Sequence, residues 1–137
     1  MGKNTFEKNK VEQYLIDLML NYRELEENLW GLEDEEHNLT GTMVMYNDPL
    51  VIFRMVLMNV PEDTDNRFAL FTKLLELNAR DVVYGAYALE QGEGQGQIIL
   101  VNTLSYETMD YEEFQSTLDA FSLVSMSHYP LLAKYRG

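Results

Sequence analysis

Apolar side chains recur at steps of three and four residues in the first part of the chain, and this period is typical of an amphipathic helix. Asn4 and Glu7 have the spacing of a capping box, so we expect the helix to begin near Thr5 and to end between residues 22 and 26. Its apolar face consists of Val11, Tyr14, Leu15, Leu18, Met19, Tyr22 and Leu25.

Two further segments have the same period and predict two more helices. The second helix begins near Pro61, where acidic residues favour the positive end of the helix dipole, and ends near Asn78 in a left-handed cap. The third begins at Asp110, which forms a cap with Glu113, and Pro130 limits its length. The apolar faces are Phe68, Phe71, Leu74 and Leu75 in the second helix and Phe114, Leu118, Phe121 and Val124 in the third.

Five segments between these helices have the alternating or continuous apolar pattern of β-strands. They comprise residues 28–34, 39–46, 50–60, 82–89 and 97–104. The acidic residues 33–38 predict a solvated turn, because adjacent like charges are costly to bury. Residues 47–49 and the glycine-rich residues 91–96 predict two hairpin turns.

The predicted order α-β-β-β-α-β-β-α indicates one α+β domain over residues 1–137, with an antiparallel sheet that carries helices on one face. Alternate side chains of the strand 50–60 face opposite sides of this sheet, and both sets are largely apolar. One set contains Val51, Phe53, Met55 and Leu57, and the other contains Ile52, Arg54, Val56 and Met58. We expect one face to meet the helices and the other to meet a further surface, such as a second subunit.

Charge narrows the range of partners. The 137 residues include 10 Lys and Arg against 23 Asp and Glu, which gives a formal net charge of −13. This charge repels a phosphate backbone or an anionic membrane surface, so we expect neither nucleic acid nor a membrane as partner. The apolar runs are far shorter than the ~20 residues of a membrane helix, and the chain has no cysteine for disulfides or thiolate ligands. We expect a cytoplasmic protein.

Chemical motifs are scarce. Residues 92–96 lack the Lys-Ser/Thr pair and the following helix of a phosphate-binding loop, so they indicate only a turn. His37 and His128 are the natural candidates for a general base, but no Ser-His-Asp pattern surrounds them and we expect structural roles. Residues 33–37 match neither calcium-loop nor zinc spacing, which leaves a weak cation site as the alternative. We therefore expect no catalysis, no cofactor and no metal.

Methionines are concentrated on two adjoining predicted strands, at Met43, Met45, Met55 and Met58. Their flexible, polarizable side chains adapt to varied apolar partners, but they also fill ordinary cores, and both roles are open. For Trp30 we expect burial, with an acceptor for the indole N–H. The candidate partner-binding residues are Trp30, Met43, Met45, Phe53 and Met55.

Local sequences along nearly the whole chain resemble the type III secretion chaperone fold, that is, the CesT/Tir chaperone group and its YbjN-like relatives. The residues that carry the resemblance are the central strand 51–58, the helix end 74–78, the hairpin entry 84–89 and the closing helix 111–121. The YbjN-like side is the closer match. The resemblance implies a small bacterial cytoplasmic protein, commonly a homodimer, that has no catalytic activity.

In the secretion members of this group, an extended segment of a client protein lies against apolar grooves. The resemblance therefore implies a protein or peptide client, held by groove or strand-edge contacts. Two alternatives are open: a YbjN-like regulatory or sensory domain that binds a folded partner, and a small-molecule-binding protein. The latter would have a deep enclosed pocket with convergent polar groups.

Overall fold

A six-stranded antiparallel sheet forms the centre of the computed structural model, which describes residues 9–92 and 94–136. The strands lie in the order β1-β2-β3-β4-β6-β5, so β1 and β5 are the edges. The longest strand, β4, pairs with β3 on one side and β6 on the other. The strand bounds are β1 Tyr22–Glu26, β2 Leu29–Leu32, β3 Thr42–Asn47, β4 Leu50–Asn59, β5 Ala86–Glu90 and β6 Gln97–Ser105.

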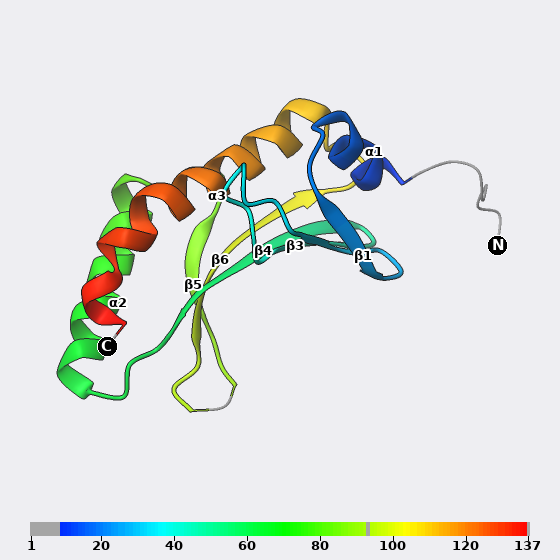
Figure 1. Ribbon diagram of the computed structural model, residues 1–137. Helices are drawn as coiled ribbons and strands as arrows, with labels where there is room; N and C mark the ends of the chain where they lie inside the picture. The colour runs from blue at the N-terminus through cyan, green and yellow to red at the C-terminus, as the bar shows by residue number, and fades with distance from the viewer. Residues whose placement is uncertain (1–8, 93, 137) are drawn as a thin grey trace.

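Three α-helices accompany the sheet: α1 (Lys10–Asp17), α2 (Thr64–Arg80) and α3 (Tyr111–Leu131), and a short 3-10 helix, η1 (Ala133–Tyr135), follows α3. Figure 1 shows α1 and α3 on one side of the sheet, with α2 beside the β5 end. The α+β class, the antiparallel sheet and the predicted order of elements are confirmed, and the structure adds one strand, β1.

The added strand lies where the sequence pattern predicted the end of the first helix. The helix stops at Asp17 because Met19 has a positive φ of 59° and the N–H of Leu20 bonds to the carbonyl of Leu15, which is the geometry of a Schellman cap. Tyr22 and Leu25 therefore belong to β1 and not to the helix. The predicted Asn4–Glu7 cap lies outside the described residues, and the observed N-cap is Asn9.

The core fills the space between the sheet and α3. Phe53 on β4 is fully buried, and its ring centroid lies 5.3 Å from that of Phe114 and 6.3 Å from that of Phe121. The predicted α3 stripe and its capping box between Asp110 and Glu113 are confirmed. The core also contains, from the sheet, Trp30, Leu32, Val44, Val51, Met55, Ile98 and Leu100.

The apolar face predicted for α2 is partly wrong. The buried residues are Leu70, Leu74 and Leu77, whereas Phe68 is 74% exposed and Leu75 is also exposed. The helix extends beyond Asn78 to Arg80, so Asn78 is not its terminator. A correct period with a rotated face is expected when apolar residues surround a helix, since periodicity does not tell which side meets the core.

Two strand predictions are corrected. Strand β5 begins at Ala86, four residues later than predicted, because Tyr84 and Gly85 have positive φ values of 55° and 158°. In β4 the pairing with β6 shifts between Val56 and Met58, and this bulge buries Met58 on the helix side, against the alternation. The two predicted hairpins are confirmed by the antiparallel pairing of β3 with β4 and of β5 with β6.

The acidic turn is also not fully solvated, because Asp34 is only 1% exposed. Burial by itself raises the pKa of this carboxyl, but the pKa is lowered overall because the N–H groups of Asn21 and His37 donate to it at 2.9 and 2.8 Å and the His37 ring lies 2.7 Å away. The side chain thus ties the entrance of β1 to the turn after β2.

We predict that Asp34 makes stability depend on pH in the acidic range. Its folded pKa is below the unfolded value, so its contribution is present above the unfolded pKa of about 4 and is lost as the pH falls through the folded pKa. Asp34→Asn should lower the free energy of unfolding by about 1–3 kcal/mol at pH 7 and flatten its decline below pH 4. Urea unfolding at several pH values measures both. An unchanged acid limb would contradict the prediction.

Trp30 is 1% exposed, as expected, but among the described residues its indole Nε1 has no hydrogen-bond partner, against the prediction of an acceptor. We predict that Trp30→Ala lowers the free energy of unfolding by about 3–5 kcal/mol, because a large buried ring leaves a cavity. The matched control is Phe68→Ala on the exposed side of α2, with an expected change under about 0.5 kcal/mol. Equal melting temperatures for both variants would contradict the assignment of Trp30 to the core.

Candidate protein-binding face

The two faces of the sheet differ in what covers them. Helices α1 and α3 lie on one face, and within the part of the chain that the structure describes no helix lies on the other, which we call the open face (Figure 1). Strand register assigns three cross-strand rows to the open face. They are Leu29–Met45–Ile52–Thr103, Gly31–Met43–Arg54–Val101–Ala86 and Val56–Ile99–Ala88.

Apolar side chains gather at the β1 end of the open face. We call Leu25, Leu29, Met43, Met45 and Ile52 the open-face patch. Leu25 is 42% exposed and Met45 is 37% exposed, while the other three are partly buried. Gly31 lets Leu25 lie across β2, because a Cβ at this glycine would be only 3.1 Å from Leu25 Cδ1. The patch is therefore continuous from the edge strand to β4.

An ion pair crosses the middle of the open face. Arg54 on β4 donates from Nε to Glu90 Oε2 on β5 at 3.2 Å, and its guanidinium also pairs with the other carboxylate oxygen. The pair is partly buried and lies over the row that contains Val56 and Ala88. The pair therefore crosses a second apolar area on β4, β5 and β6, in which Ile99 is only 7% exposed.

Strand β1 is an exposed edge with acidic side chains. Glu24 and Glu26 are exposed, and the pairing with β2 shifts between them. Arg23 forms a surface ion pair with Glu33 at 3.3 Å. Among residues 9–92 and 94–136, no strand pairs with the outer side of β1. Its outward backbone groups can therefore accept another strand.

The opposite edge, β5, is held by α2. Asn78 Oδ1 accepts a hydrogen bond from Tyr87 N at 2.8 Å, and Asn78 Nδ2 donates to Tyr87 O at 3.3 Å. An apolar groove of about 250 Å³ lies beside this contact, between the helix and the strand, and Phe71, Leu75 and Leu89 contribute to its walls. The sequence pattern did not reveal this role of Asn78, since an Asn within a helix indicates only a possible end.

The structure divides the five candidate partner-binding residues into two groups. Trp30, Phe53 and Met55 are buried under the helices, where a partner that docks on the folded chain does not contact them. Met43 and Met45 lie on the open face. Three of these residues therefore belong to the core beneath the sheet, and two lie on the face that the described helices leave uncovered.

Both histidines have structural contacts. His37 lies beside Asp34, and its backbone carbonyl accepts a bond from Ser122 on α3 at 2.6 Å. His128 Nδ1 lies 2.6 Å from the Tyr87 hydroxyl, and its Nε2 lies 3.6 Å from Asp81. Burial, with a smaller contribution from Asp81, raises the pKa of Tyr87. The Tyr87 hydroxyl therefore stays protonated at neutral pH and forms a hydrogen bond with His128.

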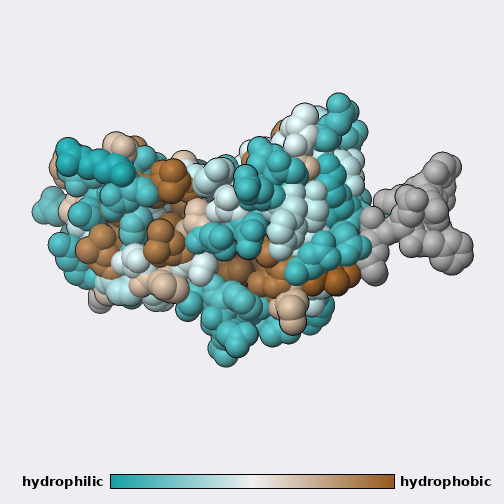
Figure 2. Space-filling model, turned by 90° about the horizontal axis from the view of Figure 1, so that it is seen from above, coloured by the Kyte–Doolittle hydropathy of each residue, from teal (hydrophilic) through white to brown (hydrophobic). Residues whose placement is uncertain are grey.

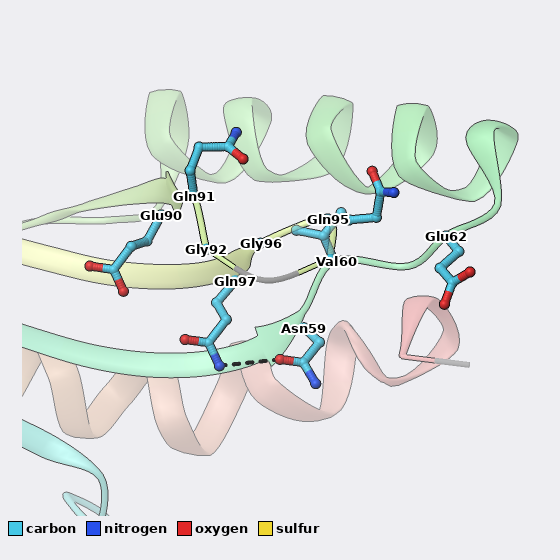
Figure 3. Close-up of a pocket in the computed structure, with 10 residues that line it drawn as sticks. Asn59, Val60, Glu62, Glu90, Gln91, Gly92, Gln95, Gly96 and Gln97 are labelled. Atoms are coloured by element: carbon cyan, nitrogen blue, oxygen red, sulfur yellow. Dashed lines mark hydrogen bonds between the residues drawn. The ribbon is translucent and has the colours of Figure 1, made fainter.

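A larger cavity, of about 530 Å³, lies at the β5–β6 turn and has mainly amide and carboxylate groups in its wall. Figure 3 shows Gln91 and Gln95 directed to one side, and Asn59 and Gln97, which form a hydrogen bond of 3.2 Å, directed to the other. These side chains do not converge on a common point. The arrangement does not resemble a small-molecule site, in which a few polar groups converge.

Seen from above in Figure 2, the surface on the helix side combines hydrophilic areas with apolar clusters. In the described part of the chain, no group of three or more acidic or histidine side chains could hold a metal ion. No described helix has the length and apolar character needed to cross a membrane.

The chain belongs to the CesT_Tir_1 family, whose model matches residues 3–136, and this confirms the resemblance found in the sequence. No match was found among curated proteins.

Solved structures share the fold at low sequence identity. YbjN from E. coli has a TM-score of 0.66 at 18% identity, covering 88% of this chain and 89% of that chain. An uncharacterized protein from Methanothermobacter thermautotrophicus has 0.61 at 9% identity, covering 93% and 96%. A chain of the heterodimeric ExoU–SpcU complex from the type III secretion system of Pseudomonas aeruginosa has 0.59 at 14%, covering 87% and 94%.

Proposed function

We propose that this protein is a non-catalytic, chaperone-like polypeptide-binding protein that holds an extended segment of its client along β1 and over the open-face patch. The observation that carries this proposal is the combination of a strand edge that no described strand pairs with and an apolar sheet surface directly beside it that no described helix covers. Membership of the CesT_Tir_1 family supports the proposal, as does the fold shared with a chain of the ExoU–SpcU heterodimer.

Strand addition uses both features at once. A segment that pairs with β1 forms main-chain hydrogen bonds, and every second side chain then points to the open face. Those side chains lie next to Leu25 on β1, whose side chain reaches across Gly31 of β2. Met43 and Met45 lie two strands further into the sheet and continue the apolar surface behind Leu25. The mode of binding therefore sets the shape of the client, an extended chain with alternating apolar positions, and leaves its detailed sequence open.

Charge sets a second preference. Glu24, Glu26 and Glu27 line or follow the β1 edge, and the whole chain has a net charge of −13. Acidic side chains on an edge strand deter pairing with another acidic chain, including a second copy, and favour a basic segment. The proposed client segment therefore alternates basic and apolar residues, in a cytoplasmic setting.

We predict that a nine-residue peptide of alternating Lys and Val, with blocked termini, binds the protein more tightly than the same peptide with Glu in place of Lys. Fluorescence anisotropy of the labelled peptides measures both affinities. Leu25→Glu should weaken the binding of the Lys peptide at least about tenfold, because Leu25 lies on the edge strand next to the added peptide and the change places a charge in the apolar contact. Added salt should weaken it as well.

The matched control is Leu123→Glu, which changes an exposed leucine on α3. It should leave the affinity within about twofold, since surface changes away from a binding site have small effects. Equal loss in both variants, or equal affinity for the Lys and Glu peptides, would contradict the proposed site.

We also propose a homodimer in which the second apolar area of the open face, formed by Val56, Val101 and Ala88 beside the Arg54–Glu90 pair, meets its copy. The observation in favour is that β4 is apolar on both sides, although helices cover only one of them. In such a dimer, the β1 edge stays free for the client.

Light scattering over a range of concentrations tests this dimer. We expect twice the chain mass of 16.0 kDa for the parent protein and the single mass for Val56→Glu. The control Val83→Glu alters an exposed valine outside the sheet and should stay dimeric. A parent protein that is monomeric at every concentration would exclude the dimer.

The alternative is a YbjN-like regulatory domain that uses the same face for a folded partner. If the chain is such a domain, pull-downs should recover a stable folded protein, and the chain should not bind the extended peptide. A small-molecule function has less support, because the polar groups around the larger cavity do not converge (Figure 3).

A further inference from the structure

The two edges of the sheet are in different states. The outer side of β1 is unpaired within the described residues, whereas β5 is in contact with a helix along its outer side. The contact is made through backbone groups at one point, Tyr87, where the side chain of Asn78 forms both hydrogen bonds.

The Asn78 amide reproduces what a neighbouring strand would offer. In an antiparallel ladder, a hydrogen-bonded pair exchanges two bonds, because the N–H of each residue donates to the carbonyl oxygen of the other. Asn78 accepts from Tyr87 N at 2.8 Å and donates to Tyr87 O at 3.3 Å, so it occupies both backbone positions at once. An added strand cannot pair at Tyr87 while this contact is present.

The rest of the β5 edge is not locked in this way. Backbone groups of alternate residues face the same side of a strand, so those of Leu89 face outward like those of Tyr87. Within the described part of the chain, no α2 side chain other than Asn78 hydrogen-bonds to the β5 backbone. Beside Leu89, the helix and strand are separated by the apolar groove of about 250 Å³.

We propose that Asn78 is the residue that confines strand addition to β1, by occupying the backbone of β5 in place of a strand. This inference rests on the proposed function, because it names the residue that decides which edge the client uses. When the amide is removed, no described side chain of α2 is hydrogen-bonded to the β5 backbone; the helix then moves away from this edge, and the outward backbone groups of β5 bind a second copy of the extended segment.

The experiment compares Asn78→Ala with the parent protein by hydrogen exchange and peptide binding. Without peptide, the Tyr87 amide should exchange roughly tenfold faster in the variant, because it loses its acceptor, while the amide of Ala88, which faces β6, should stay unchanged. With the Lys–Val peptide, the parent protein should gain protection only on β1, and the variant on both β1 and β5, with a stoichiometry of two.

Asn66→Ala is the matched control. Its Nδ2 also links α2 to another element, by donating to Tyr135 O at 3.2 Å, but at the far end of the helix from β5. It should leave Tyr87 exchange and the stoichiometry of one unchanged. If Asn78→Ala unfolds, Asn78→Leu provides the test: it keeps the approximate size of the side chain but neither accepts from Tyr87 N nor donates to Tyr87 O, and it should free the same edge.

The outcomes separate the two proposals. If the parent protein gains no protection on β1, the proposed function is wrong. Protection of β5 in the Asn78 variants alone would still support the proposal that Asn78 prevents strand addition at β5, which we call the Asn78 lock. Binding at β1 together with an unprotected β5 in both Asn78 variants overturns the lock alone. The lock is equally overturned if the parent protein gains protection on β5, or if Asn66→Ala opens this edge as well.

Discussion

The rest of this structure depends on one constraint: the long strand β4 is apolar on both faces, and the described helices cover only one of them. Strand β4 is apolar on both sides, and the packing of Phe53 against Phe114 and Phe121 directs one side to α3. An antiparallel sheet normally compensates with a polar outer face. Here the outer face keeps methionine, isoleucine and valine side chains, so the fold presents an apolar surface that its described helices leave uncovered.

The two edges of the sheet differ in whether a further strand can pair beside this surface. Acidic side chains and a register shift mark β1, and a helix with one asparagine amide closes β5. Natural sheets protect their edges by both means, that is, by charge and by a covering element. In this chain, the protection by charge is selective because it favours basic segments, whereas the protection by Asn78 does not depend on the charge of the segment.

The class of fold could be predicted from the sequence because the periods of three helices and the turns of two hairpins are local signals. The α3 stripe and its capping box illustrate this, since Asp110 and Glu113 define the helix start by their own contacts. The length of α1 could not be predicted, because a Schellman cap at a non-glycine residue, Met19, leaves no composition signal. The buried face of α2 depends on where the helix docks, and periodicity alone does not contain that information.

The candidate site was predictable only in part for the same reason. The methionine-rich strands were recognised, but whether a side chain faces core or solvent depends on register, which separates Met43 and Met45 from Met55. The most direct measurement is a crystal structure of the protein with the Lys–Val peptide. We predict the peptide as a seventh strand on β1, with its valines next to Leu25. A peptide bound on the helix side or in the cavity at the β5–β6 turn would contradict it.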